Sequence, residues 1–304
     1  MVGSTLNQES MRTRSSGTRQ RALVALYRQK DRLWLFIWLA GLACLGLWDA
    51  VFLNQPAFAL LRTAFLNTVI AGLLVVVFSL IAGWSTGVVS YFLETRRRVL
   101  SMLLTFLLNV IRSVPQIVGI LVGYVILTIL IEGEILRGQF VQLVWMAFAI
   151  SVFVFLEVVD LIKERISYYN KLDFFQAMLC CGIKEGRIIN QEILWKNSRS
   201  HLLHKMISIF GIAVFLQCSI DFIVSVGLST DVSLSNFPVT LGSLLAKMDS
   251  KQDILAIGSL FSSISNAPSL LFQHLQGISI AFAIVFTLLC VYKISNGLVK
   301  RYNL

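Results

Sequence analysis

Charged residues inside long apolar runs are the side chains of this chain that most need a chemical explanation. Arg112 stands in the run 100–131, shortly before Pro115, and Asp221 stands well inside the run 206–228. A charge at membrane depth is costly unless it is paired or hydrated, so such residues often line or gate a polar pathway. Proline removes one helix hydrogen bond and favours a kink. We expect Arg112, Pro115 and Asp221 to belong to a pathway or gate, with structural pairing of the two charges as the open alternative.

Two acidic residues near the end of another apolar run have a simpler interpretation. Glu157 and Asp160 lie about one helical turn apart near the end of the run 140–162. Lys163 and Arg165 follow within reach on the same expected helix, where side chains three or four residues apart are neighbours. We therefore favour a structural role for this acidic pair over a role in a pathway.

The remaining polar residues show no arrangement for catalysis or metal binding. His201 and His204 are three residues apart with no third ligand close in sequence, so they fit a basic flank better than a zinc site. Asn67 and Asn109 are expected to form interhelical hydrogen bonds. The chain has no Gly-Lys dipeptide, which excludes a phosphate-binding P-loop, and no HExxH motif. We expect no enzyme activity, cofactor or metal, and interpret the cysteines as free thiols. They are Cys44, Cys180, Cys181, Cys218 and Cys290.

The composition excludes an ordinary soluble domain. Of the 304 residues, 57% are hydrophobic and 14% are charged, whereas a soluble domain carries about 25% charged residues. The apolar residues come in runs of about twenty, long enough to cross the hydrocarbon core as helices. The sequence therefore predicts an all-α polytopic membrane protein with about six transmembrane helices. The expected spans are 33–53, 64–92, 100–131, 140–162, 206–228 and 270–292.

Lysine and arginine are distributed unevenly between these spans. Seven lie in the tail 1–32, three at Arg96–Arg98, eight in 163–205 and three at the C-terminal end, against four in the alternate connections. Cytoplasmic loops carry an excess of basic residues, so we expect both termini and 163–205 in the cytoplasm. We therefore attribute the net charge of +10 to membrane topology rather than to nucleic-acid binding. No cleavage site follows the tail, so the first span is expected to remain in the membrane.

The outer connection 229–269 carries two apolar stretches, VTLGSLLAKM and DILAIGSLF, expected as short interfacial or re-entrant helices.

A charged, helix-prone segment interrupts the apolar pattern at 173–197. Asp173 is a plausible helix N-cap, and the helix formers from Gln176 to Leu179 follow it. Gly182 then interrupts as a C-cap or tight turn would, and a second helical pattern runs over 188–194. The two helices are too short to span a bilayer. Such a unit rests beneath its own membrane domain or inserts a face into a groove of another protein.

This segment resembles the cytoplasmic coupling loop of ABC importer permeases. The family pattern is Glu-Ala-Ala, three residues, Gly, nine to eleven residues, then Ile-x-Leu-Pro or Ile-Leu-Pro. Here Gln176-Ala177-Met178 takes the first place, Gly182 falls four residues after Met178, and Ile193-Leu194 begins eleven residues after the glycine. Arg187-Ile188-Ile189 matches the basic-apolar-apolar run of the peptide-transporter branch. Gln176, Met178 and Trp195 replace the usual Glu, Ala and Pro.

Other stretches over residues 64–304 are similar to the same family. Asn67-Thr68 matches the start of the membrane core, and IRSVPQIVGIL (Ile111–Leu121) matches an Arg-Ser-x-Pro element of the third span. The stretches GSLLAKM and ISNGLVKRY resemble the C-terminal part of oligopeptide, dipeptide and nickel permeases. The peptide or nickel branch is the preferred assignment, with methionine- and phosphonate-type systems left open.

The resemblance implies a division into a basic cytoplasmic tail (1–32), a first transmembrane helix with a short outer loop (33–63) and a permease domain (64–304). It implies a substrate pathway for ATP-driven import of peptides or similar small solutes across a bacterial cytoplasmic membrane. The implied partners are a second permease subunit, two cytoplasmic ABC ATPase subunits and an extracytoplasmic solute-binding protein. A heterodimer of permeases is preferred, and a homodimer is left open. The coupling loop, about 172–198, would contact the ATPase. Its implied coupling residues are Gln176, Ala177, Met178, Gly182, Arg187, Ile193 and Leu194.

Two other functions stay open at this point. A degenerate permease kept as a membrane scaffold or sensor would explain the altered residues Gln176, Met178 and Trp195. A secondary transporter or channel would need no ATPase. Purification with or without a stoichiometric ATPase separates these possibilities.

Overall fold

The computed structural model describes residues 30–227, 237–247 and 275–302, and regular structure within these ranges is entirely helical. Most of the N-terminal tail, the DILAIGSLF stretch and the first residues of the expected last span lie outside the described residues. The helices are α2 (Lys30–Phe52), α3 (Gln55–Arg96), α4 (Arg98–Ser113), α5 (Gln116–Glu132), α6 (Gln139–Asn170), α7 (Asp173–Cys180), α8 (Glu185–Arg187), the π-helix η1 (Ile188–Asn197), α9 (Arg199–Gly227), α10 (Leu241–Lys247) and α13 (Leu275–Tyr302).

The prediction of an all-α polytopic membrane protein is confirmed. Among the described residues, α2, α3, α6, α9 and α13 are each long and apolar enough to cross a membrane. The expected third span, 100–131, is divided into α4 and α5, which meet at an angle of 91°. Val114 between them is extended (φ −79°, ψ 126°), because a residue that precedes a proline is disfavoured in the helical region. The break at Pro115 is therefore much sharper than the kink that proline alone favours.

The first outer connection is shorter than expected. The sequence predicted a loop before residue 64, but α3 already begins at Gln55, directly after its N-cap residue Asn54. Pro56 lies in the first turn of α3, where a missing backbone N–H costs no helix hydrogen bond. The apolar run 64–92 is thus the middle of a helix of 42 residues, about 63 Å long at 1.5 Å per residue.

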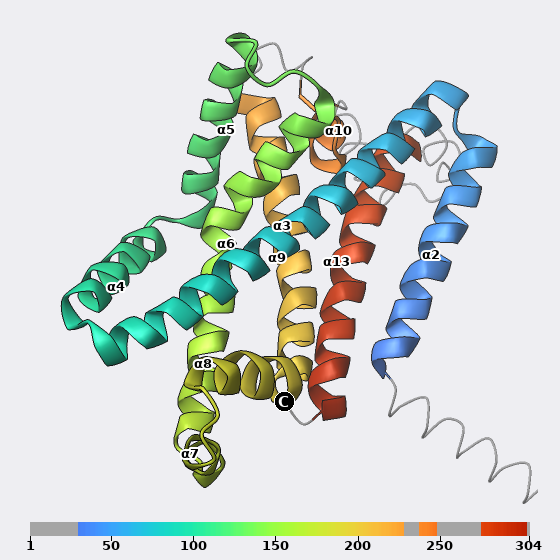
Figure 1. Cartoon of the computed structure of the whole chain (residues 1–304). Helices are drawn as coiled ribbons and strands as arrows, with labels where there is room; N and C mark the ends of the chain where they lie inside the picture. Colours follow the sequence, from blue (N-terminus) through green and yellow to red (C-terminus); the bar gives the residue numbers. More distant parts are fainter. Residues whose placement is uncertain (1–29, 228–236, 248–274, 303–304) are drawn as a thin grey trace, which may run out of the picture.

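The core of the bundle is the contact between α3 and α6, which cross closely in Figure 1. Small residues on α3 make this approach possible, as in membrane helices generally. Gly83 and Gly87 are buried on one face, four residues apart. A Cβ added at Gly83 would overlap Val158 and lie 2.9 Å from the carbonyl oxygen of Phe155, while one added at Gly87 would lie 2.7 Å from Ile162. The sequence GxxxG therefore sets the distance between the two helices.

The first helix, α2, is held mainly by α13 (Figure 1). Three polar contacts join them along their length: Arg301 donates to Asp31 (2.8 Å), Trp38 donates to Thr287 (3.2 Å) and Ser279 donates to Asp49 (2.6 Å). Asp31 and Asp49 are the buried residues of α2, and most of its apolar side chains are partly or fully exposed. The first helix is thus a peripheral span attached through α13.

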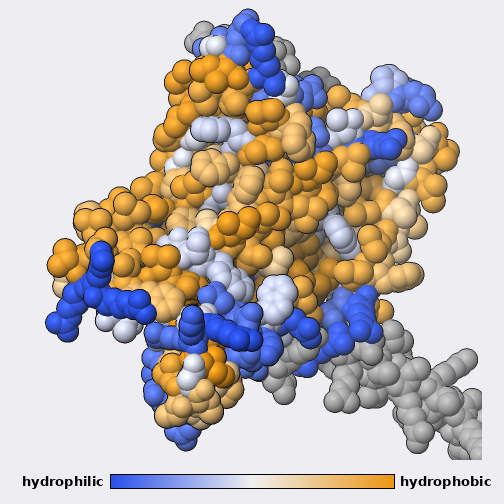
Figure 2. All heavy atoms as spheres, viewed as in Figure 1, coloured by the Kyte–Doolittle hydropathy of each residue, from blue (hydrophilic) through white to orange (hydrophobic). Residues whose placement is uncertain are grey.

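Hydrophilic residues gather at the two ends of the bundle, and apolar residues cover its middle (Figure 2). Figure 1 places the start of α2, the end of α13, the α3–α4 connection and the segment α7–η1 at the same end. The connections that the lysine and arginine count assigned to one side of the membrane therefore lie together. The α2–α3 and α5–α6 connections lie at the opposite end.

The described part of the stretch VTLGSLLAKM, expected as an interfacial or re-entrant helix, contains the short helix α10. Its residues Leu241 to Leu244 are buried, so it is not an exposed interfacial helix. Gly242 allows the close approach, because a Cβ there would lie 2.6 Å from the carbonyl oxygen of Cys218. α10 therefore closes one end of the bundle against α9, α3 and α13.

Candidate functional site

The segment 173–197 folds as two short helices joined by a glycine turn, as the sequence predicted. Leu172 is the N-cap of α7 and Asp173 is its first residue, so the expected N-cap was one residue late. The turn that ends α7 is a Schellman motif, in which Gly182 N–H donates to Leu179 (2.9 Å) and Ile183 N–H donates to Met178 (3.2 Å). Gly182 has φ +76°, a left-handed conformation that glycine adopts without steric cost.

The second helix is anchored in the bundle. It begins as α8 and continues as the π-helix η1, whose residues Ile188, Ile189, Ile193 and Leu194 are fully buried. These side chains belong to the same hydrophobic core as α3, α6 and α9. Ile193 and Leu194, expected among the coupling residues, therefore contact the chain's own core rather than solvent.

Hydrogen bonds fix the segment to α3 as well. The indole of Trp84 donates to Asn190 Oδ1 (2.9 Å), and the hydroxyl of Tyr91 donates to Glu185 Oε1 (2.9 Å). Asn190 also donates to the carbonyl of Gly186 (3.0 Å) within the segment. The second helix is thus held both by apolar burial and by two side-chain contacts to a membrane span.

The first helix of the segment projects from the bundle. Figure 1 shows α7 as its outermost element at that end. Phe175 is buried against the core, Met178 is half-buried, and Gln176 and Ala177 are exposed, as are Gly182 and Arg187. Exposed apolar side chains accompany them; these are Phe174, Leu179 and Trp195. The residues that carry the family resemblance are therefore divided between an anchoring set and an exposed set.

Arg112 forms an ion pair with Asp160. Its Nη2 donates to both carboxylate oxygens, at 2.7 and 2.9 Å, and joins α4 to α6. Both side chains are more than half exposed. This contact supports structural pairing of Arg112, one of the two alternatives that the sequence left open.

Both members of the acidic pair on α6 form ion pairs, which agrees with the favoured structural role, but the expected partners were wrong. Asp160 binds Arg112, and Glu157 accepts a hydrogen bond from Lys205 on α9 (3.0 Å). Lys163 instead donates to Glu94 on α3 (3.2 Å). Each acidic residue faces a neighbouring helix, so its basic partner comes from that helix and not from the next turn of its own. A small polar cavity of about 90 Å³ adjoins this cluster at the α4–α5 break.

Asp221 is the centre of a buried polar cluster. Tyr124 on α5 donates to Oδ1 (2.9 Å) and Thr240, just before α10, donates to Oδ2 (2.5 Å). Tyr124, Thr240 and Asp221 are each at most 4% exposed. The sequence did not identify Tyr124 or Thr240; a tyrosine alone in an apolar run was the available signal, because a buried hydroxyl usually has a partner.

The Asp221 cluster continues toward α3 and along α9. Asn67 donates to the carbonyl of Val239 (2.8 Å), and Thr68 accepts from the N–H of Leu241 (3.0 Å). Both amide atoms of Gln217, one turn from Asp221, are buried and have no hydrogen-bond partner among the described residues. A buried unsatisfied amide is costly, so Gln217 offers polar atoms that a water molecule could bind.

Asn109 does not form the expected interhelical contact. It lies exposed on α4, because it is not on the face of α4 that packs against α6. The described residues contain no group of three His, Cys, Asp or Glu that could hold a metal ion. All five cysteines are free thiols.

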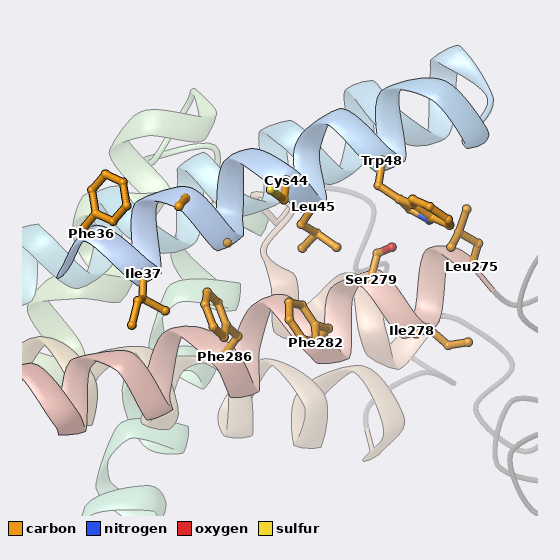
Figure 3. Close-up of a pocket in the computed structure, with 12 residues that line it drawn as sticks. Phe36, Ile37, Cys44, Leu45, Trp48, Leu275, Ile278, Ser279, Phe282 and Phe286 are labelled. Carbon is orange, nitrogen blue, oxygen red and sulfur yellow. The ribbon is translucent and has the colours of Figure 1, made fainter. Parts of the chain in front are cut away.

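An apolar groove with a volume of about 690 Å³ lies between α2 and α13 (Figure 3). Phe36, Trp48, Phe282 and Phe286 are among its lining residues, and Ser279 is its one hydroxyl. The Ser279 hydroxyl already donates to Asp49. The groove is almost entirely apolar and lies between the sides of two spans. It therefore resembles a surface in contact with lipid.

No family model matches the sequence, and no curated protein matches it.

Proposed function

We propose that this chain is the permease subunit of an ABC importer and that its segment 173–197 couples it to a cytoplasmic ATPase. The observation that carries the proposal is the division of that segment. Ile193 and Leu194 are fully buried in the membrane bundle, whereas Gln176, Ala177, Gly182 and Arg187 are exposed at its end. A segment that couples two proteins needs one part fixed to each of them.

The anchoring contacts support a mechanical role for the segment. η1 packs against α6 and α9, and Trp84 and Tyr91 on α3 bind Asn190 and Glu185. A displacement of α7 by a partner would therefore reach three spans together. Closure of the ATPase on nucleotide would move the docked segment as a rigid unit and rock the spans around the substrate path.

The polar cluster at Asp221 supports a pathway through the bundle. Asp221, Tyr124, Thr240 and Gln217 are buried where α5, α9 and the start of α10 meet. Polar residues inside a membrane bundle are expensive and commonly mark a substrate path. We propose that Asp221 lies on this path, and that Arg112 and Pro115 act on it through the position of α4.

The distribution of basic residues supports the orientation of the chain in this proposal, and the partners and substrates follow from the family resemblance. The end that carries α7 would face the cytoplasm of a bacterial cell, with the chain in the cytoplasmic membrane. The complex would contain a second permease chain, two ATPase subunits and an extracytoplasmic binding protein. Its substrates would be peptides or similar small solutes.

The experiment is purification of the tagged full chain from its native membranes, followed by measurement of bound ATPase activity. Ala177→Asp places a charge on the exposed face of α7 without filling a buried site. We expect this variant to insert normally and to lose the co-purifying ATPase. Ile135→Asp, an exposed apolar-to-acidic change at the opposite end, should keep it. So should Lys184→Ala, at an exposed position of the same segment.

Two outcomes would contradict the proposal. If the unmodified chain purifies without any ATPase, it is a scaffold or sensor, or a transporter that does not use ATP. If ATPase binds equally to the Ala177→Asp and Ile135→Asp variants, the partner does not dock on α7.

A further inference from the structure

Helix α4 runs across the bundle rather than along it. It meets α5 at 91°, and Figure 1 shows it projecting sideways near the end that carries α7. With 16 residues, it is about 24 Å long, shorter than the hydrocarbon core of about 30 Å. Its direction and length both exclude α4 from being a span by itself.

Most of the surface of α4 is apolar and exposed. One face, with Leu104, Leu108 and Ile111, packs on Leu156 and Val159 of α6. The opposite face carries six apolar side chains that expose between 47% and 80% of their surface. These are Val99, Met102, Leu103, Phe106, Leu107 and Val110. Figure 2 shows this apolar surface at the position of α4.

A narrow polar stripe separates these two apolar faces. Its members recur every three or four residues and so lie on one side of the helix. They are Arg98, Ser101, Thr105, Asn109 and Arg112. A helix with one polar stripe and an otherwise apolar circumference fits a position parallel to a membrane surface, with the stripe toward water.

Three consecutive arginines, Arg96, Arg97 and Arg98, stand where α3 passes into α4, and all are exposed. The Arg96 guanidinium lies over the ring of Phe92, 5.5 Å from its centre. Among the described residues none of the three forms an ion pair, since nearby Glu94 is bound by Lys163. Basic clusters beside a membrane span attract anionic lipid headgroups.

We propose that α4 is an interfacial helix whose apolar face is buried in the lipid, with Arg96, Arg97 and Arg98 binding the phosphates of anionic phospholipids. Lipid is the occupant that these observations favour over a protein. α4 follows directly on α3, which is long and apolar enough to cross a membrane, so the bilayer must adjoin it. Its charges complement anionic headgroups, and its polar stripe needs water on one side, which a protein covering the whole helix would remove. The inference does not depend on whether the chain binds an ATPase.

The position of α4 is tested with bimane labels in nanodiscs made of equal parts phosphatidylcholine and phosphatidylglycerol. Single cysteines replace Phe106 on the apolar face and Thr105 on the polar stripe, in a full chain whose five cysteines are replaced. The label at 106 should be quenched by lipids that carry a nitroxide in the acyl chain and not by iodide. The label at 105 should be quenched by iodide. A label at 106 that neither reagent reaches would show that protein covers this face, which would overturn the proposal.

The lipid contact is tested by energy transfer to fluorescent phosphatidylglycerol in phosphatidylcholine nanodiscs. Each basic residue near a membrane contributes about fivefold in affinity for anionic lipid. The triple variant Arg96→Gln/Arg97→Gln/Arg98→Gln should therefore weaken binding by at least about tenfold at low salt. The control Lys171→Gln/Lys184→Gln/Arg199→Gln removes the same charge at exposed positions off α4. Equal losses in the two variants would mean a general charge effect and would overturn the assignment to α4.

Discussion

The Tyr124 hydroxyl donates a 2.9 Å hydrogen bond to the Asp221 carboxylate across 97 residues of sequence. Thr240 occupies the second carboxylate oxygen, so the charge on α9 is held by partners from α5 and from the segment before α10. The same cluster adjoins the unsatisfied amide of Gln217. Asp221 thus links three elements at the centre of a buried polar cluster.

Tyr124→Phe should destabilise the protein, because it removes one partner of a buried carboxylate. Side-chain hydrogen bonds in membrane bundles contribute about 0.6 to 1.7 kcal/mol, and we expect a loss of that size in the unfolding free energy in mixed detergent micelles. The control is Tyr292→Phe, since Tyr292 is 62% exposed. The cost of Tyr124→Phe should fall in an Asp221→Asn background. Strict additivity of the two changes would contradict the contact.

The Arg112–Asp160 pair should hold α4 against α6. Because both side chains are largely exposed, we expect Arg112→Ala to cost at most about 1 kcal/mol. It should instead broaden the distance distribution between spin labels at Thr105 and Lys171. The exchange Arg112→Asp/Asp160→Arg should restore a narrow distribution. Arg137→Ala, which breaks the exposed pair with Glu134 at the opposite end, should leave it unchanged; a swap that fails to restore order would argue against the pair.

Gly182→Ala isolates the cost of a left-handed backbone. An added Cβ at Gly182 meets no atom within 4 Å, so steric clash contributes nothing. We expect a loss of about 1 kcal/mol in stability, from the positive φ alone. Gly182→Asn should cost less, because asparagine tolerates this region. Gly46 has equally open space in α2 and no positive φ, so Gly46→Ala should not be destabilising and serves as the matched control.

Gly83→Ala should be destabilising for the opposite reason. Its Cβ would meet Val158 and the backbone of Phe155, and backbone cannot move aside as a flexible side chain can. Overpacking of this kind costs about 1 to 3 kcal/mol. Thermal unfolding of Gly83→Ala and Gly46→Ala in the same detergent should separate the two. Equal stability would mean that α3 and α6 do not approach as closely as described.

The sidedness of the chain is tested by labelling single cysteines in intact cells with an impermeant maleimide. Lys184 and Ile135 are both exposed and lie at opposite ends of the bundle. Lys184→Cys should react only after the cells are permeabilised, because the basic end should face the cytoplasm. Ile135→Cys should react at once. The reverse pattern would invert the topology.

The sequence by itself determined the class of the protein and the location of its polar segment. Apolar runs long enough to span a bilayer predict helices, because a helix satisfies all of its backbone hydrogen bonds within itself when it is surrounded by lipid. The helix–Gly182–helix pattern of 173–197 was likewise readable, since helix formers and a glycine stop act locally. These features depend on residues close in sequence and on the choice between water and lipid.

Tertiary structure alone decided which side chains contact one another and in which direction α4 runs. Asp160 binds Arg112, 48 residues away, although basic residues follow it on its own helix. Ile193 and Leu194 are buried, although the motif they belong to implied contact with another protein. The bend between α4 and α5 reaches 91°, although the proline implied only a kink. Each outcome depends on how distant helices pack against one another, and the periodicity of a single helix does not contain that information.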